Sequence, residues 1–391
     1  FNFANNVEKG LVPYRDFNMV QTPLLPMINA IFLAVFGNEL IVMRILGCLL
    51  CAGILFIFYK ILILMYCGFE NYVLSSQLTK QIVFTTRRII YIMFDIITDS
   101  ACDIVREYAE THNLKLVPLY TTFDGVNYLK EQYDITHDEF YRRMTDEGAF
   151  PKSSLPSVQD FVDAIMPSVE AGRPAIVCTI TSYFSGSYNS ACTAKDIILE
   201  DHPDAKVTVI NSLLNSASFS LFIYQALQMR KAGYSYEDTI KVLEALRNDG
   251  RIMFTTESLE YLSKGGRLAK TAITITSKLS LRPIIVMKEG EIGLGGFTRT
   301  RNKGKSNVID MIQKYIESKG MPIENWDITV GYCTNLEEAE KYRDDVEAQL
   351  GVKLLERRED FKTRISIISG CHTGPYALGI ACIPKYTTIR L

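Results

Sequence analysis

Short apolar runs alternate with longer amphipathic segments through the chain beyond residue 93. Four of these runs predict strands, at residues 94–98, 115–120, 175–181 and 206–211. The segments between and after them predict helices at about residues 103–113, 136–147, 157–171, 188–199 and 216–231. Strands that alternate with helices form a mostly parallel sheet with helices on both faces. Ligands of such sheets bind beyond the carboxyl ends of the strands, so a site is expected in the loops there.

The pattern changes after residue 235. Residues 283–288 and 291–298 flank the turn Glu289-Gly290 and predict a β-hairpin. The other expected strands are residues 251–256, 327–333, 353–359, 365–368 and 377–383, and the expected helices are residues 235–248, 257–264, 305–318 and 336–350. The sequence therefore predicts two α/β domains, at residues 93–234 and 235–391, with the second and smaller one built on a mixed sheet.

The first 92 residues are expected to form a separate, hydrophobic helical segment. Residues 45–67 are apolar except for Lys60, and a bilayer span needs about 20 such residues. Residues 41–67 are therefore expected either to contact or anchor to a membrane, or to form part of a buried pair of hairpin helices. Met93 stands where a soluble protein can begin, so the boundary is placed there.

Composition excludes several classes of function. The net charge is −2, so no overall field favours nucleic acid, and no nucleic-acid partner is expected. The nine cysteines are scattered without zinc-like spacing, which indicates a reducing compartment and no metal site. Neither Gly-x-x-x-x-Gly-Lys-Ser/Thr nor Gly-x-Gly-x-x-Gly is present, which argues against a nucleotide-binding enzyme.

The loop after the expected strand 175–181 is rich in hydroxyl groups. Thr181, Ser182, Ser185 and Ser187 surround Gly186 at the point where a helix begins. The amino end of a helix offers unpaired N–H groups and favours an anion. The loop therefore predicts either an anion site or an ordinary N-cap.

Three further segments carry candidate site residues. Residues 151–157 contain Ser153 and Ser154, in either a binding loop or a turn before a capped helix. Residues 257–267 end in Gly265-Gly266-Arg267, whose alternative role is a helix C-cap with a solvated arginine. His372 lies on an expected glycine-flanked loop between two strands, where a histidine can also be structural.

Together with residues 95–100, these segments resemble the DegV family of bacterial fatty-acid-binding proteins, from Met93 to about residue 385. The resemblance implies a two-domain α/β fold that holds one long-chain fatty acid in a tunnel between the domains, without another cofactor. It also implies a partner, an ATP-binding fatty acid kinase subunit, that phosphorylates the carboxylate to an acyl phosphate. The chain itself is then a cytoplasmic ligand-presenting subunit rather than an enzyme, with membrane association only through residues 1–92.

The resemblance also implies roles for single residues. The expected carboxylate-binding residues are Ser153, Ser154, Ser185, Gly186 and His372. Arg267 matches the arginine near the site of phosphoryl transfer. The chain departs from the family at residues 215–217, where it lacks the usual glycine, and this affects the expected loop geometry.

A second resemblance concerns about residues 1–70. Residues 9–17 and 21–24 resemble the first outer loop of membrane glycosyltransferases that use polyprenyl-phosphate sugars. Asp16 matches the functionally important acid of that loop. The other membrane spans of that family are absent, so this segment is expected to be a fragment or a fused upstream sequence.

Two alternative functions stay open. Ser185, His372 and an acid such as Asp99 could form a hydrolase triad, although the loop lacks the Gly-x-Ser-x-Gly pattern. The other alternative is a membrane-tethered lipid-binding protein anchored through residues 41–67.

Overall fold

The computed structural model describes residues 94–266 and 281–390, and these residues all belong to one compact unit. The predicted hydrophobic segment 1–92, with its span at residues 41–67 and Asp16, lies outside the described residues. Within the described ranges, no helix combines the length and the apolar character that crossing a bilayer requires. The predicted domain boundary at residues 234 and 235 stays a prediction.

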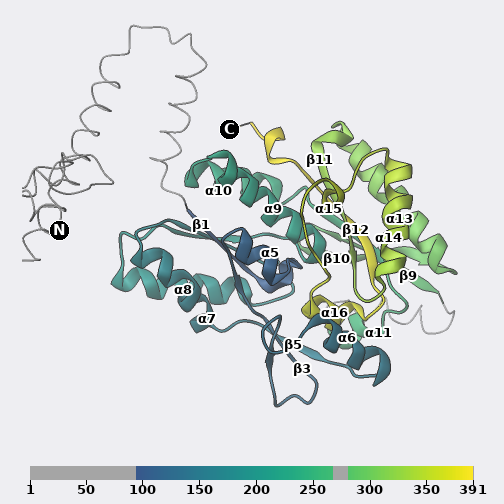
Figure 1. The fold of residues 1–391 in the computed structure, drawn as a ribbon, viewed down its shortest axis with the longest axis horizontal. Helices are drawn as coiled ribbons and strands as arrows, with labels where there is room; N and C mark the ends of the chain where they lie inside the picture. Colours follow the sequence, from purple (N-terminus) through teal and green to yellow (C-terminus); the bar gives the residue numbers. More distant parts are fainter. Residues whose placement is uncertain (1–93, 267–280, 391) are drawn as a thin grey trace, which may run out of the picture. The chain divides into compact units, whose positions relative to one another are not determined.

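A four-stranded sheet occupies the first half of the described chain (Figure 1). Its order is β2 (Leu114–Val117), β1 (Asp95–Asp99), β6 (Ala175–Thr179) and β7 (Val207–Asn211). All neighbouring strands run parallel, which confirms the predicted parallel sheet. Successive side chains point to opposite faces, so Ile96 and Ile97 enter two different hydrophobic cores.

Helices cover both faces of the parallel sheet. On the face of Ile97 lie α7 (Val158–Glu170) and α8 (Ser187–Asp201). A capping box starts α7, because Ser157 and Asp160 each accept the main-chain N–H of the other. On the face of Ile96 lie α9 (Ser216–Ala232) and α10 (Tyr236–Leu246).

The second large sheet has the order β10 (Glu291–Thr298), β9 (Arg282–Lys288), β8 (Arg251–Thr255), β12 (Leu378–Pro384) and β11 (Trp326–Tyr332). Every pair in it is antiparallel, so the expected mixed sheet is wrong, although its hairpin is confirmed. Helices between strands suggested parallel pairs, but strand direction depends on which strands become neighbours. α13 (Arg301–Ser318) and α14 (Leu336–Leu350) cover the outer face of this sheet.

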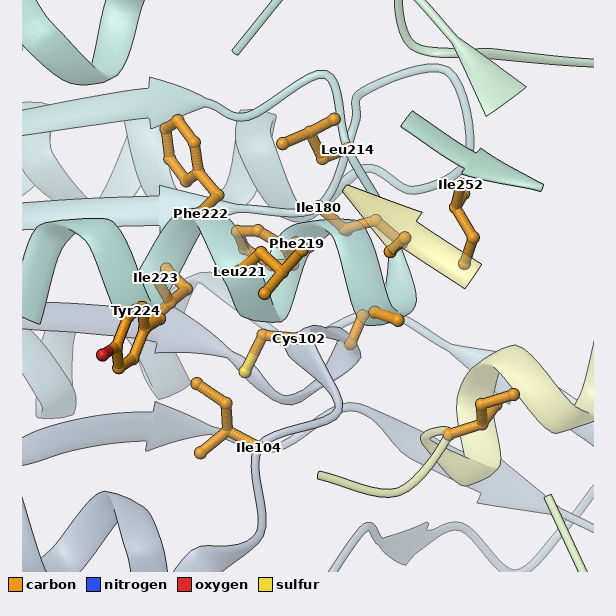
Figure 2. Close-up of a cluster of buried hydrophobic side chains, with 14 of the residues drawn as sticks. Cys102, Ile104, Ile180, Leu214, Phe219, Leu221, Phe222, Ile223, Tyr224 and Ile252 are labelled. Carbon is orange, nitrogen blue, oxygen red and sulfur yellow. The ribbon is translucent and has the colours of Figure 1, made fainter. Parts of the chain in front are cut away.

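Helix α9 lies between the two large sheets and packs against both. Phe219 and Phe222 of α9 share one core with Ile252 of β8 (Figure 2). A helix that is apolar on all sides is typical of full burial. Its buried serines Ser218 and Ser220 donate to main-chain carbonyls one turn back, which satisfies their hydroxyls inside the core.

A small antiparallel sheet was not predicted. Its order is β4 (Leu129–Lys130), β3 (Tyr120–Thr122) and β5 (Lys152–Ser154). Ser153 and Ser154 therefore lie on a strand and not in the expected turn. The polar residues of β5 carry no strand-like apolar pattern, which explains why periodicity alone missed it.

The expected strands at residues 353–359 and 365–368 are also wrong. Residues there form α15 (Leu355–Arg358) and α16 (Ile367–Thr373), so His372 lies on a helix and not on a loop. A short apolar run fits a strand or a buried helix equally well. Here Ser366 accepts the N–H of Ile368 and starts α16 as an N-cap. The remaining described α-helices are α5 (Arg106–Thr111), α6 (His137–Asp146) and α11 (Glu260–Lys264).

Candidate functional site

A cavity of about 210 Å³ is lined by residues of the antiparallel five-stranded sheet, the small sheet, α16 and the loop between β6 and α8. The predicted carboxylate-binding residues all line it, namely Ser153, Ser154, Ser185, Gly186 and His372. They come from three segments that are far apart in the sequence, and the fold brings them to one place. Their binding role stays a prediction. Arg267 lies outside the described residues.

Two hydrogen-bonded pairs involve hydroxyl groups of the cavity lining. Ser153 Oγ lies 2.8 Å from Nε2 of His372. Ser185 Oγ lies 2.9 Å from Ser187 Oγ and accepts the N–H of Ser187 at 3.2 Å. A Cβ atom on Gly186 would lie 3.2 Å from Cδ1 of Leu155, the residue after β5. The loop before α8 and the end of β5 are therefore neighbours in the cavity wall.

The amino end of α8 lies in this wall. Gly186 is the N-cap of α8 and has no side chain to bind the first N–H groups. Ser185 Oγ accepts the N–H of Ser187, and the helix dipole with the other N–H groups of the first turn favours an anion there, which is one of the two roles predicted for this loop. Thr181 and Ser182 support the loop instead, because Thr181 donates to the carbonyl of Gly290 and Ser182 accepts from Asn211.

The rest of the cavity wall is mainly apolar. It includes Ile180, Ile252, Phe254 and Met287, which are at most 6% exposed. Ser153, Ser185 and His372, in contrast, are only partly buried. The cavity therefore combines a few partly exposed hydrogen-bonding groups with a buried apolar wall. This combination suits a ligand that has one polar group and a hydrocarbon chain.

Helix α11 packs tightly against the histidine. A Cβ atom on Gly265 would lie 2.1 Å from Nδ1 of His372, so a side chain cannot fit there without moving the imidazole. Gly265 is also the C-cap residue of α11, and its φ of −73° needs no glycine. Glycine is therefore required at this position because a larger residue would collide with the imidazole, and not because of the backbone conformation.

Sequence reasoning missed several polar lining residues, namely Asn215, Ser216, Ser369 and Thr373. Ser369 and Thr373 lie on the same face of α16 as His372, so a helix prediction for this segment would have found them. Ser216 has a φ of 52°, in the left-handed region that favours glycine. This residue lies in the stretch where the chain departs from the expected glycine-bearing pattern.

The hydrogen bonds differ from those of the predicted hydrolase triad. His372 pairs with Ser153, while Ser185 pairs with Ser187. The carboxyl group of Asp99 accepts the N–H of Ile180 at 2.9 Å and that of Ala101 at 3.2 Å. Asp99 thus holds the main chain of the loop and of the turn after β1.

Comparisons with known proteins show what the chain is similar to. The protein family described as "Uncharacterised protein, DegV family" matches residues 93–385. A DegV domain-containing protein of Staphylococcus aureus is 29% identical over 290 residues, which cover 74% of this chain and 98% of that protein.

Two solved structures are also similar. The stearic-acid-binding protein of Eubacterium ventriosum is 44% identical, with a TM-score of 0.72, and the match covers 76% of this chain and all of that one (100%). DegV of Bacillus subtilis, described as a fatty acid binding protein, is 25% identical with a TM-score of 0.64, and the match covers 75% of this chain and 100% of that one.

Proposed function

The chain belongs to the DegV family, and from this premise we propose that it binds one long-chain fatty acid in the cavity described above. The proposal rests on one observation: the Ser153–His372 pair and Ser185 line the same cavity as a buried apolar wall. The relative that is 44% identical is a stearic-acid-binding protein, which supports the same class of ligand.

The hydrocarbon chain supplies the driving force. Each buried methylene contributes about 0.8 kcal/mol. A chain of about 15 methylenes thus gains roughly 12 kcal/mol before the costs of association and ordering are subtracted. The buried side chains of Ile180, Ile252 and Phe254 are the surface against which this gain is made.

The carboxylate needs hydrogen bonds to replace its hydration. In the proposed complex, the Nε2–H of His372 donates to Ser153 Oγ, which leaves the hydroxyl proton of Ser153 for the carboxylate. Ser185 and the first N–H groups of α8 donate from the other side. Ser154 provides a further hydroxyl in the same wall.

The proposal extends to a partner kinase. A carboxylate oxygen of the bound fatty acid attacks the γ-phosphorus of ATP held by the partner, which forms an acyl phosphate and releases ADP. The partial exposure of Ser153, Ser185 and His372 supports access to the head group from outside. In this scheme the chain presents the substrate and Arg267 lies near the transferred phosphoryl group.

Native mass spectrometry of the purified full chain tests ligand binding. Stearic acid is expected to bind at one molecule per chain, and stearyl alcohol, which has the same tail without the carboxylate, is expected to compete poorly. Equal binding of the alcohol would show that the head-group assignment is wrong. Absence of any acyl ligand would show that the function itself is wrong.

A second experiment tests separately whether a partner kinase phosphorylates the bound fatty acid. The loaded chain, ATP and the partner kinase are incubated with hydroxylamine, which traps an acyl phosphate as a hydroxamate. Hydroxamate that depends on all three components is expected. If stearic acid binds but no hydroxamate forms, the chain is a fatty-acid carrier and its proposed role with a kinase is wrong.

A further inference from the structure

Three fully buried carboxyl groups lie behind the cavity wall. Asp99, Asp103 and Glu131 are each at most 1% exposed, and none of them lines the cavity. Burial of a carboxyl group is costly unless hydrogen bonds compensate it. The partners of these groups therefore show what the burial achieves.

Each carboxyl group binds a segment that forms part of the cavity wall. Asp103 accepts the hydroxyl of Ser216 at 2.5 Å, at the start of α9, and the N–H of Ser366 at 2.8 Å. Glu131 accepts the hydroxyl of Ser100 at 2.5 Å and the N–H of Ile367 at 2.8 Å. Two of these bonds hold the amino end of α16.

Helix α16 depends on such contacts. It has only 7 residues, and isolated helices shorter than about 12 residues are not stable in water. Its first N–H groups are bound by carboxyl groups from distant segments, which is the preferred location for acids at a helix. Tyr141 also holds α16 in place, because its hydroxyl donates to the carbonyl of Ile365 and its ring fills the space beside Gly370.

We infer that Asp103 and Glu131 are positioning residues for His372, because they hold the amino end of α16 and so keep the imidazole beside Ser153. This inference rests on the proposed function, in which the imidazole orients the hydroxyl that binds the fatty-acid carboxylate. Asp99 acts in parallel on the other wall, since it holds Ile180 at the start of the loop that carries Ser185.

The test compares variants of the full chain that differ at Glu131. Glu131→Leu removes both acceptor oxygens at similar size, and Glu131→Gln keeps one oxygen for the N–H of Ile367. The matched control is Asp327→Leu. Asp327 is a buried acid of β11, only 3% exposed, that accepts from Gln225 and Arg358 and does not line the cavity.

Two quantities are measured with stearic acid labelled with ¹³C at its carboxyl carbon. These are the dissociation constant and the chemical shift of the bound carboxyl group, which reports its hydrogen bonds. Glu131→Leu is expected to weaken binding about fivefold or more and to move the shift, because a buried N–H loses its partner. Glu131→Gln is expected to restore most of both, and Asp327→Leu to change neither, although it lowers the free energy of unfolding.

The outcomes separate the two proposals. A wild-type chain that binds no stearic acid would overturn the proposed function together with this inference. If the wild-type chain binds stearic acid but Glu131→Leu changes neither the dissociation constant nor the chemical shift, the inference alone is overturned. The inference is also overturned if Asp327→Leu changes both quantities as much as Glu131→Leu does. If Glu131→Leu does not fold, Glu131→Asp gives the same readout, since it keeps the carboxyl group but is too short by one methylene.

Discussion

The hydroxyl of Ser153 lies 2.8 Å from Nε2 of His372, although 219 positions separate the two residues in the sequence. Ser153 belongs to the small sheet and His372 to α16, and neither element was predicted. Their contact nevertheless joins two residues that the sequence had marked as candidates for one site. It is the contact on which the proposed head-group binding depends.

Removing both sides of the proposed head-group site is expected to abolish retention of fatty acid. The variant Ser185→Ala with His372→Ala deletes one donor from each wall and should stay folded, because both residues are only partly buried. Each lost hydrogen bond to a charged group costs roughly 1.5–3 kcal/mol of binding. Native mass spectrometry should show the chain without a stoichiometric acyl ligand. The control, Ser318→Ala with His202→Ala, makes the same changes outside the cavity lining and should keep the ligand.

Gly265→Ala is expected to weaken fatty-acid binding by displacing the imidazole. The new methyl group would lie 2.1 Å from Nδ1 of His372, and overpacking of this kind costs about 1–3 kcal/mol. The cost should largely vanish in a His372→Ala background, which a double-mutant cycle on the free energy of unfolding measures. Gly293→Ala is the control, because its nearest contact would be an ordinary 3.9 Å. Equal destabilisation in both backgrounds would show that the imidazole is not the group displaced.

The free energy of unfolding is expected to fall as the pH rises from about 4 to 8. Burial raises the pKa of Asp99 and of Glu131 to about 7 and that of Asp103 to about 8, with the charge of Glu131 adding to both aspartates. In the unfolded chain these groups titrate near pH 4, so their contribution to stability is present below that pH and is lost as the pH rises through 7 to 8.

Urea unfolding at a series of pH values measures this slope. Asp103→Asn should flatten it, and asparagine tolerates the left-handed φ of 59° at this position. Asp95 serves as a contrast. Burial raises its pKa, but bonds from Arg173 and Ser168 outweigh burial and the net pKa is lowered, so its contribution is already complete near pH 5. An unchanged slope in Asp103→Asn would contradict the assignment.

Ester hydrolysis that depends on a serine is not expected. A nucleophilic serine needs a base within hydrogen-bond reach and a third group that orients the base. Ser153 and His372 meet the first requirement, but Asp99 is engaged by the main-chain N–H groups of Ile180 and Ala101. Turnover of p-nitrophenyl octanoate should therefore be the same for the wild type and Ser153→Ala. A loss of turnover in the variant would favour a hydrolase.

Residues 93–391 expressed alone are expected to retain the fatty acid. Every described residue that lines the cavity lies within this part of the chain, and the described residues form one compact unit. The ligand extracted from this fragment should match that of the full chain by mass spectrometry. A fragment that folds without ligand would show that residues 1–92 contribute to binding.

The parallel sheet was predictable because it rests on local signals. Strand β6 is a continuous apolar run, and Ser157 with Asp160 forms a recognisable capping box. The second sheet was harder, since the direction of β12 depends on which distant strands become its neighbours. The helix at His372 was missed for the same physical reason. The acids that hold its amino end come from residues more than 200 positions earlier.

The same long-range bonds set an order of events during synthesis. Asp103 leaves the ribosome 263 residues before its partner Ser366. At about 5–20 residues per second, its carboxyl group waits roughly 13–50 seconds for that partner. By the end of this interval all four strands of the parallel sheet, which ends with β7, have already been synthesised. The proposed head-group site is therefore incomplete until His372 has been synthesised, close to the end of the chain.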